Sequence, residues 1–187
     1  TEAAAILSDL VARHPNVPDY ASAHVLTLLK LAGAEGAADD AEAAERALER
    51  AAATQETLAA RFPEVPPYTE WLGWIQRGRA DCLEKLGRTD DALAALDDAL
   101  VTFEILLAEA PTRGAVEGPW DKTYRSARGN LADAYQARGR LLAETGDASG
   151  AEAAFRNELF LREVRDDRGG RFGPGSKRPP GLPDDEP

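Results

Sequence analysis

Few residues in this sequence have the type and spacing that chemistry requires. His24 has no partner at the spacing of metal ligands, and His14 takes a loop position that Phe62 occupies in a related segment, which favours a structural role. The single cysteine, Cys82, excludes an internal disulfide framework. It lies on the small-residue face of an expected helix, so a packed thiol is favoured over a reactive one.

The acidic and glycine-rich positions also lack catalytic or ligand spacing. Paired acids stand next to each other in the chain, so on a helix their side chains diverge and cannot converge on one ligand. These pairs are Asp39/Asp40, Asp97/Asp98 and Asp166/Asp167. No EF-hand spacing occurs, and Gly73, Gly78 and Gly87 do not follow a strand as in phosphate-binding loops. The sequence therefore predicts no catalytic residues, no metal site and no cofactor.

Composition narrows the classes of partner. A formal net charge of -11 over 187 residues argues against nucleic acid and against anionic membrane surfaces. No apolar run is long enough for membrane insertion. The chain contains no Met and no signal peptide, which favours a processed product or a piece of a larger chain or complex. A bacterial cytoplasmic or periplasmic location stays open.

Two segments are near copies of each other and organise the rest of the chain. Residues 83–100 and 142–159 carry a Leu, a Gly, an Ala and a bulky apolar residue at matching spacing. Gly87 and Gly146 stand where one helix must end, because glycine enters the left-handed backbone conformation at little cost. Thr89 and Asp147 are then expected to cap the next helix.

The same spacing predicts how the helices of each unit pack. Ala92 and Ala151 let two helix backbones approach closely, and Leu96 and Phe155 fill the space beyond them. Such a helix-turn-helix unit cannot bury its apolar face alone and must stack on copies of itself. The predicted fold is all-α, with about seven helices in an α-α superhelix, or solenoid, of stacked antiparallel helix hairpins.

These residues resemble the tetratricopeptide repeat (TPR). The small residue that this family has in the first helix is matched by Ala80 and Gly139, and the large residue after it by Leu83 and Leu142. The sequence departs from the family pattern at two places. They are Arg79 and Arg138, where the family usually has Leu, and Gln76, which replaces the aromatic residue that Tyr135 keeps. The resemblance implies a right-handed superhelix whose first helices line a concave groove.

A loop with two prolines recurs between the units. HPNVPDY at 14–20 returns as FPEVPPY at 62–68, and both Pro63 minus Pro15 and Pro111 minus Pro63 give a period of 48. The first Pro ends the incoming helix, and the second fixes φ for the outgoing one. This long repeat is similar to repeats common in large planctomycete proteins, including regions beside serine/threonine kinase domains.

The period divides the chain into a repeat domain and a tail. The predicted domain covers residues 1–165, with a half repeat at 1–14 and repeats at about 19–62, 67–110 and 117–165. Because the first unit is half a repeat, its helix should need cover from preceding residues or another chain. Residues 166–187 are rich in Gly and Pro and are interpreted as a tail or linker. Its basic residues could instead dock on an acidic partner or on the chain's own face; they are Arg168, Arg171, Lys177 and Arg178.

The repeats differ in apolar content. In the first repeat we expect a helix at 20–32, a flexible connector GAEGAADD, and an alanine-rich helix from about Asp40 to Arg61 that buries little area. The second helix of the second repeat has the strongest amphipathic stripe and should form the centre of the core. Among the aromatic residues, Trp71 and Trp120 are expected to lock neighbouring repeats together. Trp74 falls on the groove side.

Fixed offsets from each Gly turn select the residues that should line the groove. They are Lys30, Trp74, Arg77, Asp81, Lys85, Asp133, Gln136 and Arg140. Four of these are cations in an acidic protein, and Arg offers paired donors for carboxylates, which predicts an acidic or C-terminal-carboxylate peptide as ligand. The alternative is that these cations pair with Asp81, Asp133 and neighbouring acids and bind nothing.

Three functions are compatible with this pattern. The first is a non-catalytic protein–protein interaction module that holds a peptide or protein segment in its groove. The second is a structural or scaffold subunit that uses its edges and ends, for which large apolar residues should be exposed on the convex face. The third is a sensory region attached to a serine/threonine kinase.

Overall fold

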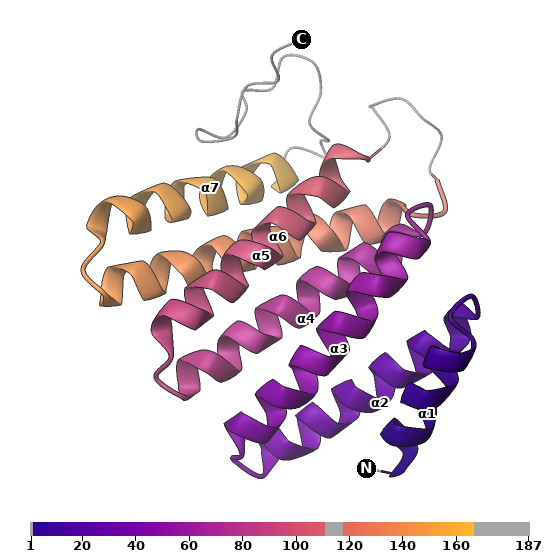
Figure 1. The fold of residues 1–187 in the computed structure, drawn as a ribbon. Coiled ribbons are helices and arrows are strands. Elements are labelled where there is room, and N and C mark those ends of the chain that lie inside the picture. The colour runs from indigo at the N-terminus through magenta and orange to yellow at the C-terminus, as the bar shows by residue number, and fades with distance from the viewer. Residues whose placement is uncertain (1, 111–117, 167–187) are drawn as a thin grey trace.

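The chain folds entirely into helices over the part that the computed structural model describes, residues 2–110 and 118–166. Within these residues there are seven helices and no strand (Figure 1). They are α1 (Glu2–Arg13), α2 (Pro18–Ala37), α3 (Ala41–Arg61), α4 (Pro66–Lys85), α5 (Thr89–Ala108), α6 (Asp121–Glu144) and α7 (Ala148–Asp166). The predicted fold class is confirmed.

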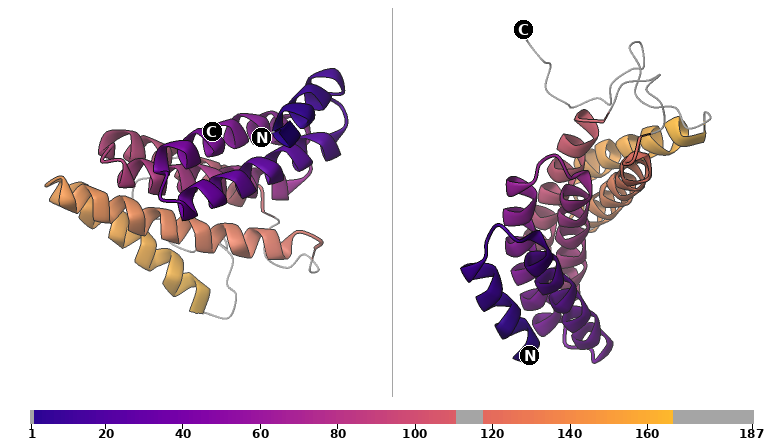
Figure 2. Two further views of the ribbon diagram at one scale, coloured as in Figure 1. Left: turned by 90° about the horizontal axis from the view of Figure 1, so that it is seen from below. Right: turned by 90° about the vertical axis from the view of Figure 1, so that its right-hand side faces the viewer.

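Each helix packs against the next one along the chain. The hairpins α2–α3, α4–α5 and α6–α7 stack in order, and of the helices described here α1 packs only on α2. The two ends of the described chain consequently lie at opposite ends of the stack (Figures 1 and 2). A stack in which each unit contacts only its neighbours is the expected solution for hairpins that cannot bury their apolar faces alone.

The turn inside each hairpin uses a left-handed residue at the repeat position. Gly87 has φ 71° and Gly146 has φ 89°, as the sequence predicts. Asp39, which precedes Gly87 by the period of 48, adopts φ 62° although it is not glycine. Asp is among the residues that tolerate this conformation, because its short side chain can form local hydrogen bonds. The three hairpins therefore share one turn geometry.

Two local predictions at these turns are wrong. The segment GAEGAADD is mostly helical: α2 continues through Gly33 and Gly36 to Ala37, so the connector is much shorter than expected. Thr89 is the first residue of α5 and not its cap; Arg88 precedes the helix and makes no side-chain cap bond. By contrast, the Asp147 carboxylate accepts a hydrogen bond from the Gly150 amide at 2.9 Å, as a cap should.

The proline loops repeat at atomic detail. The His14 and Tyr20 rings meet edge to face at 5.8 Å between centroids, and Phe62 and Tyr68 do so at 6.2 Å. The Val17 amide also donates to the His14 carbonyl, as the Val65 amide donates to that of Phe62. His14 thus takes the structural place of Phe62. The third connection, in which Pro111 continues the period of 48, lies outside the described residues at 111–117.

Size complementarity fixes the distance between the two helices of each hairpin. In the third hairpin, a Cβ added at Gly139 would lie 2.8 Å from the Phe155 ring. In the second hairpin the equivalent residues are Ala80 and Leu96, both buried. A larger residue on one helix is matched by a smaller one on its partner, which keeps the backbones close at native packing density.

The two arginines that depart from the tetratricopeptide pattern join consecutive hairpins. Arg79 of α4 bonds Glu45 of α3 at 2.9 Å, and Arg138 of α6 bonds Asp97 of α5 at 2.6 Å. Both pairs link a first helix to the second helix of the preceding hairpin. Polar contacts therefore stand where an apolar contact is expected.

Candidate functional site

The surface that the sequence selects lies where two first helices approach each other. Helix α4 contacts α6 directly, whereas α3, α5 and α7 make no contact with one another within the described helices. When helices on one side of a stack meet and those on the other side are spread apart, the first side is the inner one. Figure 2 shows the stack from two further directions. The inner face is therefore formed by α4 and α6.

Two ion pairs set the register between these helices. Arg77 Nη1 lies 3.3 Å from Asp133 Oδ2, and Arg140 Nη2 lies 2.7 Å from Glu84 Oε2. Both pairs join residues 56 positions apart, so α4 and α6 run parallel along this face. The same offset places Trp74 level with Asn130.

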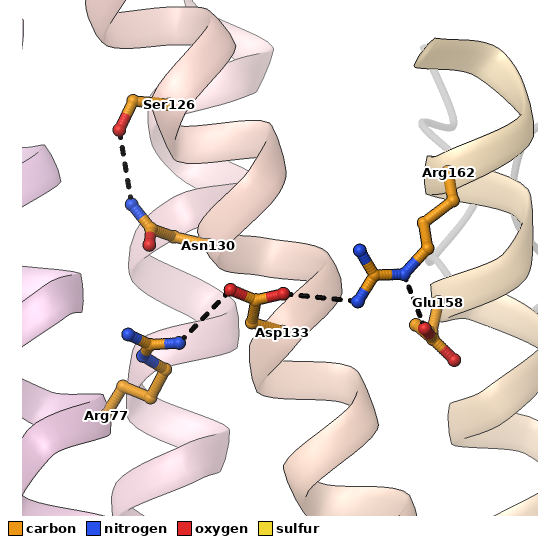
Figure 3. A network of polar contacts seen from close by, with 6 residues as sticks. All are labelled: Arg77, Ser126, Asn130, Asp133, Glu158 and Arg162. Carbon is orange, nitrogen blue, oxygen red and sulfur yellow. Dashed lines mark hydrogen bonds and ion pairs between the residues drawn. The ribbon is translucent and has the colours of Figure 1, made fainter. Parts of the chain in front are cut away.

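A polar network extends from this interface to α7. Asp133 is shared, because its second oxygen lies 3.2 Å from Arg162 Nη2 (Figure 3). Arg162 in turn bonds Glu158, which is buried, and on the α6 side Asn130 donates to Ser126 at 3.4 Å. Figure 3 shows the Asp133 carboxylate between the two guanidinium groups. Asp133 thus holds one arginine from α4 and one from α7.

The surroundings shift the pKa values of two carboxyl groups on this surface in opposite directions. The hydrogen bond from Arg140 lowers the pKa of Glu84 because it stabilises the charged form. Although Asp81 is exposed at the surface, neighbouring side chains take its carboxyl partly out of water, and this raises its pKa against the opposing effect of Arg77. Asp81 therefore gains a proton more readily than an ordinary aspartate.

Four of the eight predicted groove residues line one shallow depression. It has a volume of about 510 Å³ and is lined by Arg77, Asp133, Gln136, Ala137 and Arg140. The sequence offsets therefore brought together side chains that are neighbours in space. Gln136 is exposed and makes no hydrogen bond to another described residue, so its amide is available to a ligand.

Two predicted residues do not belong to this surface. Lys30 lies on α2, which makes no contact with α4 within the described residues. Lys85 lines a different depression of about 620 Å³, next to the acidic turn between α2 and α3. The offsets assumed one continuous row of first helices, but the row is interrupted between α2 and α4. Of the four predicted cations, Arg77 and Arg140 are ion-paired on this surface, which is the pairing that the sequence left open as the alternative.

The tryptophans are more exposed than expected. Trp71 and Trp120 are 40% and 36% exposed and belong to neither core cluster, so neither side chain is fully enclosed; that they lock neighbouring repeats together stays a prediction. Trp74 is 44% exposed on the α4 face that also carries Arg77. On α6, small polar residues and Gly129 lie level with Trp74. A Cβ added at Gly129 would meet open space. The indole of Trp74 is therefore free to accept an apolar group.

Sequence reasoning missed Glu84, Glu158 and Arg162. Gly146 follows Gly87 by 59 residues, and Arg162 follows Phe103 by the same number. Arg162 is therefore the equivalent of Phe103 in the next hairpin, so a cation occupies a position where the repeat predicts an apolar core residue. That break in the apolar register was the available signal. Glu84 gave no such signal, because an acid near the end of an exposed helix face is ordinary.

The described residues were also compared with the requirements for a metal site, a reactive thiol and a membrane span. No group of three or more His, Cys, Asp or Glu side chains there could hold a metal ion. Cys82 is half-buried, and burial raises the pKa of its thiol, as expected of a packed cysteine. Of the helices described, none combines the length and apolar character that crossing a membrane requires.

Comparison with known proteins adds no assignment. No protein-family model, no curated protein sequence and no solved structure matched this chain. The tetratricopeptide resemblance accordingly rests on the residues quoted above, and function must be argued from the surface itself.

Proposed function

We propose that this chain is a non-catalytic interaction module that binds an extended peptide or protein segment on the inner face of α4 and α6. The observation that carries this proposal is the half-exposed indole of Trp74 beside a polar depression. Tryptophan is enriched at the energetic centres of protein interfaces, where it combines a large apolar area with a polar edge.

The ion pairs define which ligands this face suits. Arg77 and Arg140 already have carboxylate partners, so an acidic ligand must compete with Asp133 and Glu84. A ligand that places an apolar side chain on Trp74 and hydrogen-bonds Gln136 meets no such competition. We therefore propose that an apolar side chain provides most of the affinity, and that acidic character in the ligand is secondary.

The test is selection of peptides from a random library on the intact chain, followed by affinity measurement with variants. Trp74→Ala should weaken binding of the selected peptides by at least about 2 kcal/mol, or roughly thirtyfold. Gln136→Ala should weaken it less. Leu159→Ala is the matched control, because Leu159 is an exposed apolar residue on α7.

The result that would overturn the proposal is equally specific. Selected peptides that bind Trp74→Ala as tightly as the parent, or lose affinity only with Leu159→Ala, would place the site elsewhere. Affinity that falls steeply with salt would restore the acidic ligand that the sequence suggested, because only charge pairs are strongly screened.

One observation supports a second function, that of a structural subunit. Large apolar side chains are exposed on the second helices, with Val101, Ile105 and Leu159 each more than half exposed. Ile6 on α1 is similarly exposed. A scaffold that binds through its outer face or its ends needs such residues. Cross-linking of the intact chain to its neighbours would distinguish the two functions, since contacts would map to α5, α7 or α1 and not to Trp74.

A further inference from the structure

The outward face of α5 carries an apolar and acidic stripe that the proposed peptide site does not use. Val101 and Ile105 are 55% and 53% exposed and lie one helical turn apart. Asp98, one turn before Val101, is exposed and forms no ion pair with another described residue. Residues at these spacings share one helix face. We call Asp98, Val101 and Ile105 the α5 ridge.

The charge of α5 restricts what can cover this ridge. The helix contains five carboxylates and no cation: Asp90, Asp91, Asp97, Asp98 and Glu104. Three of them already have partners, in Arg88, Arg138 and the Tyr135 hydroxyl. A second copy of the chain would bring the same acids to the contact and be repelled. The occupant must therefore combine cations with an apolar group.

The chain itself contains a segment of this chemistry. Residues 168–182, which lie outside the described part, include four cations, no acid, and the apolar side chains of Phe172 and Leu182. The segment follows α7, and α7 ends at the same end of the molecule as the half of α5 that carries Val101 and Ile105 (Figures 1 and 2). An extended chain spans at most about 3.5 Å per residue, so a segment of this length can reach α5.

We propose that residues 168–182 dock on the α5 ridge of their own chain. The cations pair with Asp98 and its acidic neighbours, and Phe172 covers Val101 and Ile105. Covalent attachment gives such a segment an effective concentration in roughly the millimolar range, so weak contacts suffice. An outside partner of the same chemistry would have to displace it. The contact is independent of the peptide site on α4 and α6.

The test uses the full-length chain and its single cysteine. In a Cys82→Ala background, Ser176→Cys provides one site for a nitroxide spin label, and the amide signals of isotope-labelled protein report proximity. At low salt, signals of residues 98–105 should broaden selectively. Broadening should vanish near 1 M salt, where the Debye length is about 3 Å. Reduction of the label gives the reference spectrum.

Variants make the outcome decisive. Asp98→Lys and Val101→Gln/Ile105→Gln should each remove the broadening while the remaining amide signals stay in place, which shows that the fold is intact. Leu159→Gln, at an exposed apolar residue of α7, should leave it unchanged. Absence of broadening on α5 at low salt would overturn the proposal. Broadening seen only between spin-labelled and isotope-labelled chains in a mixture would show that the occupant is a second copy, and would overturn it equally.

Discussion

The first and second hairpins share one period but fill their interiors differently. Leu48 and Leu96 are equivalent residues 48 positions apart, and both are buried. About two turns further on, the second hairpin buries Phe103, whereas the first hairpin buries Gln55 at the equivalent position. The Phe103 ring packs on Gly73, and the Gln55 amide donates instead to the Tyr68 carbonyl at 2.8 Å.

The consequence is two separate core clusters of unequal kind. The cluster around α5 buries Leu96, Leu100, Phe103 and Leu106, while the cluster around α3 is built mainly from alanines. Burial of apolar area stabilises by about 25 cal/mol per Å², so alanines contribute less than leucines and phenylalanine. A repeat register thus fixes where side chains point, but the residue types decide how much each hairpin contributes to stability.

The largest expected change in stability comes from substituting Phe103, and it should exceed the change from substituting the equivalent Gln55. Phe103→Ala should lower the free energy of unfolding by about 3–5 kcal/mol, because it opens a cavity beside Gly73. Gln55→Ala should cost less, about 0.5–1.5 kcal/mol, because it removes one hydrogen bond to the Tyr68 carbonyl, which still has its partner within α4. Denaturant unfolding followed by circular dichroism measures both. Equal losses would remove the distinction between the hairpins.

The next comparison uses the equivalent leucines. Leu96→Ala should cost about 2–5 kcal/mol, and Leu48→Ala should fall at the lower end of that range, because its alanine neighbours can close around the smaller residue. Ala92→Leu should also destabilise, by about 1–3 kcal/mol, since Ala92 is fully buried against the neighbouring helix. If Leu96→Ala and Ala92→Leu both melted with the parent, the packing register described here would be incorrect.

Glycine substitutions should change stability in opposite directions in the two hairpins. A Cβ at Gly73 would lie 2.7 Å from the Phe103 ring, so Gly73→Ala should destabilise by about 1–3 kcal/mol through overpacking. Gly33 in α2 has open space around the same position, and Gly33→Ala should stabilise by about 0.5–1 kcal/mol through helix propensity. Thermal melting of the two variants checks the signs; a stabilising Gly73→Ala would contradict the close approach.

The smallest expected effect is a pH dependence confined to the first hairpin. His24 Nδ1 and the Thr54 hydroxyl lie at hydrogen-bond distance, 3.2 Å, and the buried Nε2 has no partner within the described residues. Burial, and then the charge of Arg50, lower the pKa of His24 below 6.5. Protonation is therefore less favourable in the folded chain than in the unfolded one.

The sign of the effect follows from this difference. Stability is complete above pH 6.5 and falls as the pH drops below it, by at most about 1.4 kcal/mol per pH unit. Hydrogen exchange of α2 and α3 between pH 7.5 and 5.5, corrected for intrinsic rates, should show the loss, with α5 as the internal control. The His24→Gln variant should lose the pH dependence. A parent chain with no pH dependence in α2 would contradict this account of His24.

The sequence predicted the repeat framework well because that framework follows from local rules. Left-handed turns at Gly87 and Gly146 and the recurring proline loops both depend on residues near one another in the chain. The turn at Asp39 and the helical course of Gly33 and Gly36 escaped prediction. Both are cases in which the surrounding helix pair overrides the weak preference of single residues.

The candidate site shows more clearly what the sequence alone could not predict. Helical spacing alone placed Arg77, Asp133, Gln136 and Arg140 on one face, and the structure confirms that they share one depression. Spacing could not show that Asp133 bridges two arginines, because Arg162 comes from a helix whose approach depends on how hairpins stack. Charge content therefore could not decide between free and paired cations, and for Arg77 and Arg140 the structure has ion pairs.

What the sequence determined by itself is the class of fold, the period and the identity of the small and large residues that meet inside each hairpin. These features arise from backbone conformation and helical periodicity, which act over a few residues. The tertiary structure alone decided that α4 meets α6 while α2 does not meet α4, and hence which predicted residues share a surface. It also decided which apolar side chains remain exposed, because exposure depends on the angle and distance between helices. Many residues far apart in the chain contribute to these quantities.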